Sequence, residues 1–211
     1  MTSIALFKAT SFVALLIALA PAHGADCKSY EHQLETMRHA DEGVRSMWQG
    51  QEISADFASS RVAQMTDLVD RRNTAQLKAL VRRCGWPTKT VQGSPAVEAA
   101  WLIVQHTDDL ALQERVLPMV RRAVELQEES GQDLALLEDR IAIAHDKPQR
   151  YGTQMQPAPP CGFDFLPIAD AAHVDERRSK LGLVPLAEYK KQVERTMSSE
   201  QCQATNQTPK P

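Results

Sequence analysis

The sequence has no hydrophobic run long enough to span a membrane, either near its start or later. A membrane-spanning helix needs about 20 apolar residues, and the apolar run 12–20 is far shorter. That run follows a positive charge at Lys8 and precedes Pro21 and small residues, which is the pattern of a secretory signal peptide. We expect residues 1–24 to be removed after Gly24. The rest is then a periplasmic or secreted protein that does not insert into the membrane.

The sequence also lacks a strong excess of charge of either sign. Loss of the signal peptide removes Lys8 and no acidic residue, which changes the net charge from -3 to -4. This weak charge excludes nucleic acid and anionic lipid as expected partners. No internal repeat and no low-complexity segment divides the chain. We therefore expect a single domain over residues 25–197, followed by a polar tail over 198–211.

Cysteines are few, and no two of them have the C-x-x-C spacing of redox or zinc sites. All four lie in the exported part, where disulfides persist. Four cysteines allow three pairings. We therefore favour a structural role, two disulfides or one with free thiols, over a redox or zinc site. The preferred pairing is Cys84 with Cys161 and Cys27 with Cys202.

Apolar residues recur at intervals of three and four residues in the first half of the chain, which is the periodicity of α-helices. We expect one helix over residues 28–48 and a second over 58–69. Asn73 or Thr74 can cap a short third helix. Gly85 would end that helix, because glycine readily adopts the conformation found after a helix.

The segment from Ser94 to His106 is apolar on nearly every side, which predicts a central, buried helix. Ser94 would be its cap. The next helix is capped by Asp108 or Asp109 and continues to about residue 128. Pro118 lies inside it and predicts either a kink or two short helices. A further helix, capped by Asp133, ends near Pro148.

After Pro148 the periodicity changes, and residues 151–156 and 163–168 are short extended candidates. Two more helices follow, over residues 172–181 and from Pro185 onward. The fold class is therefore mainly α, with a single helical domain of about seven or eight helices. A small β-hairpin or extended segment lies near residues 151–168.

His106 is the first candidate site residue, at the carboxyl end of the central helix. The helix dipole and nearby Asp108 both favour the imidazolium form, so His106 can act as a general acid and base. Its neighbours Gln105 and Asp108 are candidate ligand-binding residues. Alternatively, His106 hydrogen-bonds the carbonyl groups at its own helix end.

Asp139 and Arg140 form the second candidate pair, near the border of the apolar stripe of their helix. A carboxylate and a guanidinium in this position can orient His106 or bind an anionic group. The alternative is a structural ion pair between two helices.

Polar residues follow the same helix, and we interpret them as candidate ligand-binding residues: Gln149, Tyr151, Thr153 and Gln154. In a strand Tyr151 and Thr153 would share one face. Gly152 would allow close approach of a ligand or of another strand. Arg178, in a later helix, is a further candidate. The same side chains could instead bond a hairpin to the helices.

Two His-x-Asp pairs, His106 with Asp108 and His173 with Asp175, could hold a divalent ion if the fold joined them. No H-E-x-x-H or comparable spacing supports this reading. We expect neither a metal nor a cofactor.

Several of these residues belong to motifs through which the chain resembles a family of uncharacterised bacterial proteins, a domain of unknown function. The motifs are Gly85-Trp86-Pro87, Gln105-His106-Thr107-Asp108 with Gln113, Leu137-Glu138-Asp139-Arg140, Pro148 to Gln154, and Val174 to Arg178. The resemblance covers roughly residues 70–189 and implies a shared fold and a shared polar site. It implies no activity.

Two functions compete. The first is a binding module of the periplasm, whose partner is a small ligand, a peptide or a protein. The second is a small hydrolase or lyase with His106 as general acid and base, Asp139 orienting it, and Arg140 with Tyr151 stabilising negative charge. We favour binding, because no serine or cysteine lies in a setting that would make it a nucleophile.

Overall fold

The computed structural model describes residues 27–47, 60–158 and 162–205, with the side chains of 197–205 left out. Its elements are α1 (Tyr30–Ser46), α3 (Arg61–Cys84), α4 (Lys89–Gln92), α5 (Ser94–His106), α6 (Leu110–Glu125), α7 (Gly131–Ala144), β1 (Met155–Ala158), β2 (Gly162–Phe165), the 3-10 helix η1 (Ala171–His173), α8 (Val174–Lys180) and α9 (Leu186–Thr205). The eight α-helices of this described part confirm the mainly helical fold class.

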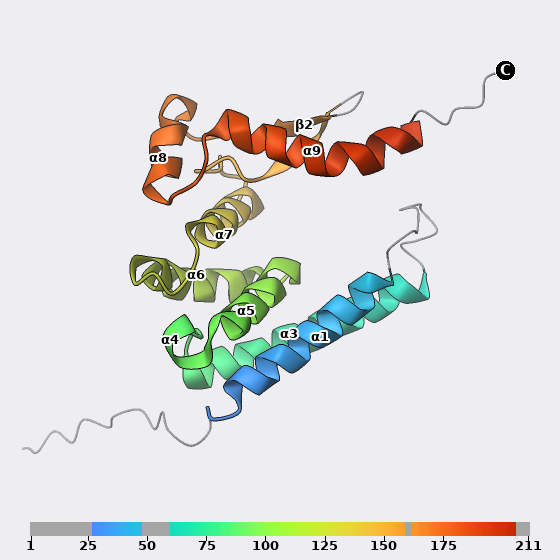
Figure 1. The fold of residues 1–211 in the computed structure, drawn as a ribbon, viewed down its shortest axis with the longest axis vertical. Helices are drawn as coiled ribbons and strands as arrows, with labels where there is room; N and C mark the ends of the chain where they lie inside the picture. Colours follow the sequence, from blue (N-terminus) through green and yellow to red (C-terminus); the bar gives the residue numbers. More distant parts are fainter. Residues whose placement is uncertain (1–26, 48–59, 159–161, 206–211) are drawn as a thin grey trace, which may run out of the picture.

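The helices are stacked in approximate chain order (Figure 1). Helices α1 and α3 pack side by side at one end, and α8, α9 and the hairpin lie at the other. The hydrophobic core joins α1, α3, α5, α6 and α7, and its fully buried side chains include Leu34, Leu77, Ala100, Val104, Leu112 and Val116. Within the described residues, no helix combines the length and the apolarity needed to cross a membrane.

Helix α3 corrects the prediction of two separate helices over 58–69 and from residue 73. Asn73 and Thr74, expected as caps, lie buried inside one continuous helix. The Asn73 amide donates to the carbonyl of Met37 in α1 at 3.0 Å, and the Thr74 hydroxyl donates to Thr107 at 2.8 Å. Their polar groups therefore connect helices instead of ending one. Gly85, with φ of 78°, does end α3 as predicted.

Helix α5 is central and buried as predicted, but Ser94 is not its cap. Gly93 is the residue before the helix, and Ser94 is the first helical residue with no capping hydrogen bond. Helix α6 is one uninterrupted helix that contains Pro118, so of the two predicted alternatives, a kink or two short helices, the second is wrong. Asp109 caps α6 as predicted, with its carboxylate accepting from Leu112 N at 2.8 Å.

Helix α7 begins one turn before its predicted cap. The hydroxyl of Ser130 accepts a hydrogen bond from Asp133 N at 3.1 Å, so Ser130 caps the helix and Asp133 belongs to its first turn. Ser and Asp are both good caps, and the sequence offered both within four residues. The chain after α7 then turns toward the hairpin.

Strands β1 and β2 form the expected small antiparallel hairpin, in which Met155 pairs with Phe165. The strand begins at Met155, so the extended segment predicted from Tyr151 is wrong over residues 151–154. Those residues form a loop, because a buried carboxylate in α7 collects their backbone N–H groups. Helix α9 continues to Thr205 and includes the first residues of the expected polar tail.

Among the described residues, a disulfide joins Cys27 to Cys84, with 5.8 Å between their Cα atoms. Both predicted pairings, Cys84 with Cys161 and Cys27 with Cys202, are therefore wrong. The bond connects the start of α1 to the end of α3, two helices that pack side by side. Cys161 and the side chain of Cys202 lie outside the described residues.

Candidate functional site

The predicted site residues separate into two groups. Asp139, Gln149, Tyr151, Thr153, Gln154 and Arg178 lie together around the loop that follows α7. His106, Gln105 and Asp108 lie at the carboxyl end of α5, and Arg140 reaches this second group from α7. The predicted pairing of Asp139 with His106 does not form, because each contacts a different set of residues.

We call the first group the Asp139 clamp. The carboxylate of Asp139 is fully buried and accepts hydrogen bonds from the backbone N–H groups of Arg150, Tyr151 and Thr153 at 2.6, 2.9 and 2.9 Å. The Thr153 hydroxyl donates to it as well, at 2.9 Å. Burial raises the pKa of Asp139, and these donors oppose the shift because they stabilise the ionised form.

Two further buried side chains close the clamp. The Gln149 amide donates to the carbonyls of Gln154 and Leu166, both at 2.8 Å, and accepts from Gln154 N at 2.8 Å. The Arg178 guanidinium donates to the carbonyls of Tyr151 and Val184, both at 2.7 Å, and its central carbon lies 4.9 Å from the centre of the Tyr189 ring.

These contacts give the clamp a structural role. Asp139, Gln149 and Arg178 are almost completely buried, and their polar groups bond to the protein itself. Gly152, with φ of 71°, packs against Leu186 of α9, where an added Cβ would lie 2.5 Å from Cδ1. The close neighbours of Gly152 are therefore α9 and Ile168, which follows the hairpin. The clamp fixes α8 and α9 onto α7.

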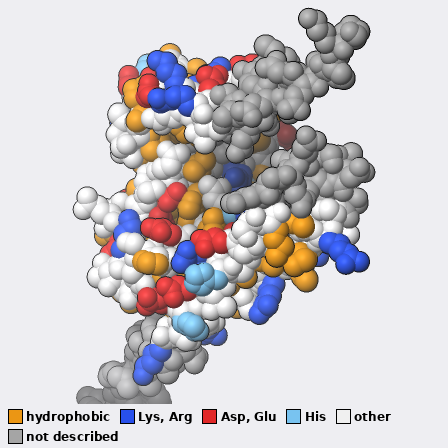
Figure 2. Space-filling model, turned by 45° about the vertical axis from the view of Figure 1, so that its right-hand side comes forward, with side chains coloured by type: hydrophobic (Ala, Val, Ile, Leu, Met, Phe, Trp, Pro, Cys, Tyr) orange, Lys and Arg blue, Asp and Glu red, His pale blue; other side chains and the backbone are white. Residues whose placement is uncertain are grey.

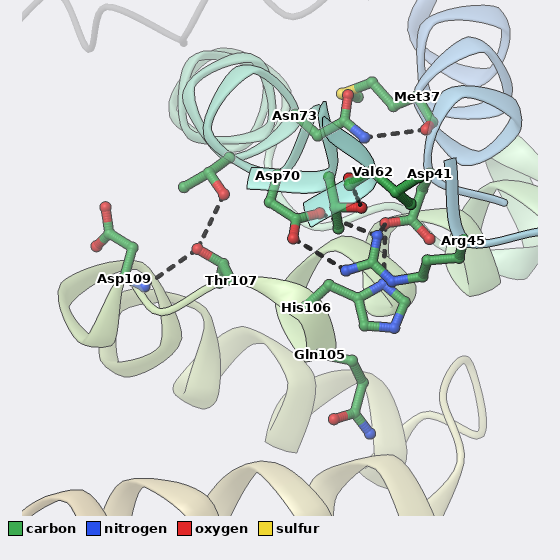
Figure 3. A network of polar contacts seen from close by, with 12 residues as sticks. Met37, Asp41, Arg45, Val62, Asp70, Asn73, Gln105, His106, Thr107 and Asp109 are labelled. Carbon is green, nitrogen blue, oxygen red and sulfur yellow. Dashed lines mark hydrogen bonds and ion pairs between the residues drawn. The ribbon is translucent and has the colours of Figure 1, made fainter. Parts of the chain in front are cut away.

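The second group centres on His106 and a carboxylate from α1 (Figure 3). His106 Nδ1 lies 2.9 Å from Asp41 Oδ1, and Asp41 is almost completely buried. Arg45 donates to the same oxygen at 2.7 Å and makes two further bonds to Asp70 of α3, both at 3.0 Å. Asp41 Oδ2 is buried and has no hydrogen-bond partner among the described residues. Three helices thus contribute to one charged network.

Asp41 is the residue that orients His106, and it was not among the predicted site residues. Asp41 lies on the buried face of α1, which also carries Leu34, Met37 and Val44. A carboxylate at a position that should be apolar is the signal that could have identified it, because buried charges need a partner. Arg45 follows four residues later, on the same face of the helix.

The turn between α5 and α6 holds His106 in place. The Thr107 hydroxyl accepts from Asp109 N at 3.1 Å as well as from Thr74, and the Gln113 amide donates to the Thr107 carbonyl at 3.0 Å. Arg140 donates to the carbonyl of Gln105, next to the last residue of α5. Burial lowers the pKa of Arg140, and the charge of Asp108 opposes that change.

His106 lines a pocket of about 440 Å³ between α3 and this turn. The pocket is lined by Ala63, Thr66, Asp67, Asp70, Arg71, Thr74, Ala75, Lys78, His106, Thr107, Asp108 and Asp109. Acidic and basic side chains are interspersed on the face of the molecule drawn in Figure 2, with no large area of one sign. The pocket lining itself carries charges of both signs, from four aspartates, one lysine and one arginine.

The two His-x-Asp pairs do not form a metal site. His173 bonds Asp170 of its own turn, with Nδ1 at 2.8 Å from Oδ1, while His106 bonds Asp41. Over residues 27–47, 60–158 and 162–205, no group of three or more His, Cys, Asp or Glu side chains is placed to hold a metal ion.

Comparison with known proteins supports the resemblance seen in the motifs. A family model described as a family of unknown function (DUF6624) matches residues 29–200. The chain belongs to this family. The matched range includes every residue of the pocket and of the Asp139 clamp, so both are parts of the family domain. Searches of curated proteins and of solved structures find no match.

Proposed function

We propose that the pocket at the carboxyl end of α5 binds a small polar ligand and that His106 contacts it. The hydrogen bond between His106 Nδ1 and Asp41 carries this proposal. An ionised carboxylate only accepts hydrogen bonds, so the neutral imidazole carries its proton on Nδ1 and leaves the lone pair of Nε2 unshared. His106 is 28% exposed and lines the pocket, which leaves its ring within reach of a ligand.

The Asp139 clamp is a less suitable binding site than this pocket. Its polar groups are bonded to loop backbone, whereas the His106 network is incomplete at Nε2. A side chain held by three helices but open to a cavity is the arrangement expected of a binding group, because the protein fixes its orientation before the ligand arrives.

Native mass spectrometry of the purified protein tests this proposal. We expect a co-purified or added metabolite to remain bound to the protein and to be lost in His106→Gln. His145→Gln is the matched control, because His145 is exposed, bonds Glu114 and lies outside the pocket. Equal retention of the metabolite by His106→Gln and the unchanged protein would contradict the proposal.

A second function, acid-base catalysis, is favoured by the same hydrogen bond. A histidine whose Nδ1 donates to a buried carboxylate has the orientation and tautomer that general bases use. This is the hydrolase or lyase alternative with Asp41 in the role first given to Asp139. Conversion of the bound metabolite by the unchanged protein but not by His106→Gln favours catalysis. Unchanged mass over several hours favours binding alone.

We also propose that the protein is exported to the periplasm or secreted after cleavage following Gly24. The signal-like residues 1–24 and the disulfide between Cys27 and Cys84 support this location, since disulfides persist in oxidising compartments. Cell fractionation followed by amino-terminal sequencing should give a mature chain that begins at Ala25. A cytoplasmic protein that begins at Met1 would contradict it.

A further inference from the structure

The cations that line the pocket are already bonded to carboxylates. Lys78 Nζ lies 2.5 Å from Asp109 Oδ2, and Arg71 Nη1 lies 2.6 Å from Asp67 Oδ2. The bond to Lys78 also lowers the pKa of Asp109, as expected of an ion pair. A ligand anion would therefore have to compete with a carboxylate of the protein for each of these two cations.

Two threonine hydroxyls of the pocket, those of Thr66 and Thr74, also donate hydrogen bonds within the protein. The Thr66 hydroxyl donates to the carbonyl of Val62 at 2.9 Å, and that of Thr74 donates to Thr107. Neither of these two hydroxyl protons is therefore available to a ligand acceptor.

Two acceptors of the lining remain available. The Asp108 carboxylate is exposed and makes no hydrogen bond or ion pair with any side chain that the structure describes, and Arg140 interacts with it only electrostatically. His106 Nε2 is the second acceptor, because Asp41 holds the proton on Nδ1. Both residues line the same pocket, on one short turn.

We infer that the ligand of this pocket carries a cationic nitrogen, a primary ammonium or a guanidinium, which donates to Asp108 and His106. The inference rests on the proposed binding function of the pocket. An ammonium group has three donors and no acceptor, which suits two acceptor groups in one pocket. Of the four carboxylates that line the pocket, those of Asp67, Asp70 and Asp109 are each paired with an arginine or a lysine, which leaves Asp108 for a positive ligand.

Isothermal titration calorimetry with defined probes tests the ligand class. The cationic probes are lysine methyl ester and 1,5-diaminopentane, and the anionic probe is glutarate. The titrations use low ionic strength, because salt screens exposed charges. We expect both amines to bind at one site and glutarate not to bind.

Asp108→Asn should weaken amine binding roughly ten- to hundredfold, the loss expected for one charge-assisted hydrogen bond. Asp164→Asn is the matched control, since it removes the same charge from an exposed position in β2 and should change nothing. Arg71→Gln should leave amine binding unchanged or tighten it, because it removes a competing cation from the lining.

Three results would overturn the inference: no heat with either amine, equal amine affinity in Asp108→Asn, or binding of glutarate that His106→Gln abolishes. The last result contradicts only the cationic class and leaves the pocket's binding function in place. A different result would contradict the binding function itself: His106→Gln would retain the co-purified metabolite in native mass spectrometry.

Discussion

Replacing Glu129 by Gln should remove a pH dependence that this buried carboxyl gives to the stability of the protein. Glu129 lies in the turn between α6 and α7 and is 7% exposed. Its carboxyl accepts from Trp86 Nε1 at 3.2 Å and from Ser130 N at 3.0 Å. Burial raises the pKa of Glu129 to about 7, and the neighbouring carboxyl of Asp133 adds to the shift.

The sign follows from the two pKa values. Between pH 4.5, the ordinary value for Glu, and about pH 7, the unfolded chain ionises Glu129 while the folded protein keeps it protonated. The unfolded state therefore gains stability across this window, and the folded state loses about 3 kcal/mol of its advantage as pH rises. The stability that the raised pKa of Glu129 gives to the folded state is fully present below pH 4.5 and is lost above about pH 7. Because Gln does not titrate, Glu129→Gln removes this dependence of stability on pH.

Urea unfolding followed by circular dichroism, at several pH values from 4.5 to 8, measures the effect. The free energy of unfolding of Glu129→Gln, minus that of the unchanged protein, should rise by about 3 kcal/mol across this range. Any pH-independent cost of the lost acceptor cancels in this comparison. Glu128→Gln is the control, since Glu128 is exposed and the hydroxyl of Thr90 lowers its pKa. A difference for Glu129→Gln that stays constant with pH would refute the reasoning.

Four other substitutions or treatments test the fold. Asp139→Asn should cost about 3 kcal/mol or more in urea unfolding, because the new amide nitrogen cannot accept from the buried loop N–H groups; an unchanged midpoint would contradict the clamp. Reduction of the bond between Cys27 and Cys84, 57 residues apart, should cost about 4 kcal/mol, seen as a lower urea midpoint in dithiothreitol. Gly131→Ala should lower the melting temperature, since its Cβ would lie 2.1 Å from a carbonyl oxygen at the end of α8. Gly43→Ala, with open space around the new Cβ, should raise it.

Local signals in the sequence predicted much of the helical framework. Gly85 ends α3 and Asp109 caps α6 as expected, because both act through the few residues beside them. The prediction of a buried helix over residues 94–106 was also correct, because a helix that is apolar on all sides is stable only when it is surrounded by other elements.

The errors concern residues whose partners are distant in the chain. Asn73 suits a cap as well as an interhelical hydrogen bond, and only the position of Met37 in α1 decides between them. Cys27 and Cys84 are joined because α1 and α3 pack side by side, which spacing alone does not specify. Tertiary packing determines both the role of Asn73 and the pairing of Cys27 with Cys84.

The candidate site shows the same limit. The motifs that contain His106 and Asp139 were recognised as polar centres, but their partners were not. Asp139 bonds a loop 11 to 14 residues later, which converts an expected strand into a turn. His106 bonds Asp41, 65 residues earlier. No local pattern relates Asp41 to His106, so the network became apparent only in the fold.

The most direct test of the central claim is long-range proton-nitrogen NMR of the His106 imidazole in protein labelled with ¹⁵N-histidine. At a pH where the ring is neutral, we predict a protonated Nδ1 and an unprotonated Nε2, with this preference lost in Asp41→Asn. Addition of the metabolite identified by native mass spectrometry should shift the Nε2 resonance of His106 and leave that of His145 unchanged. A proton on Nε2, or a His106 signal that does not respond to the metabolite, would contradict the account.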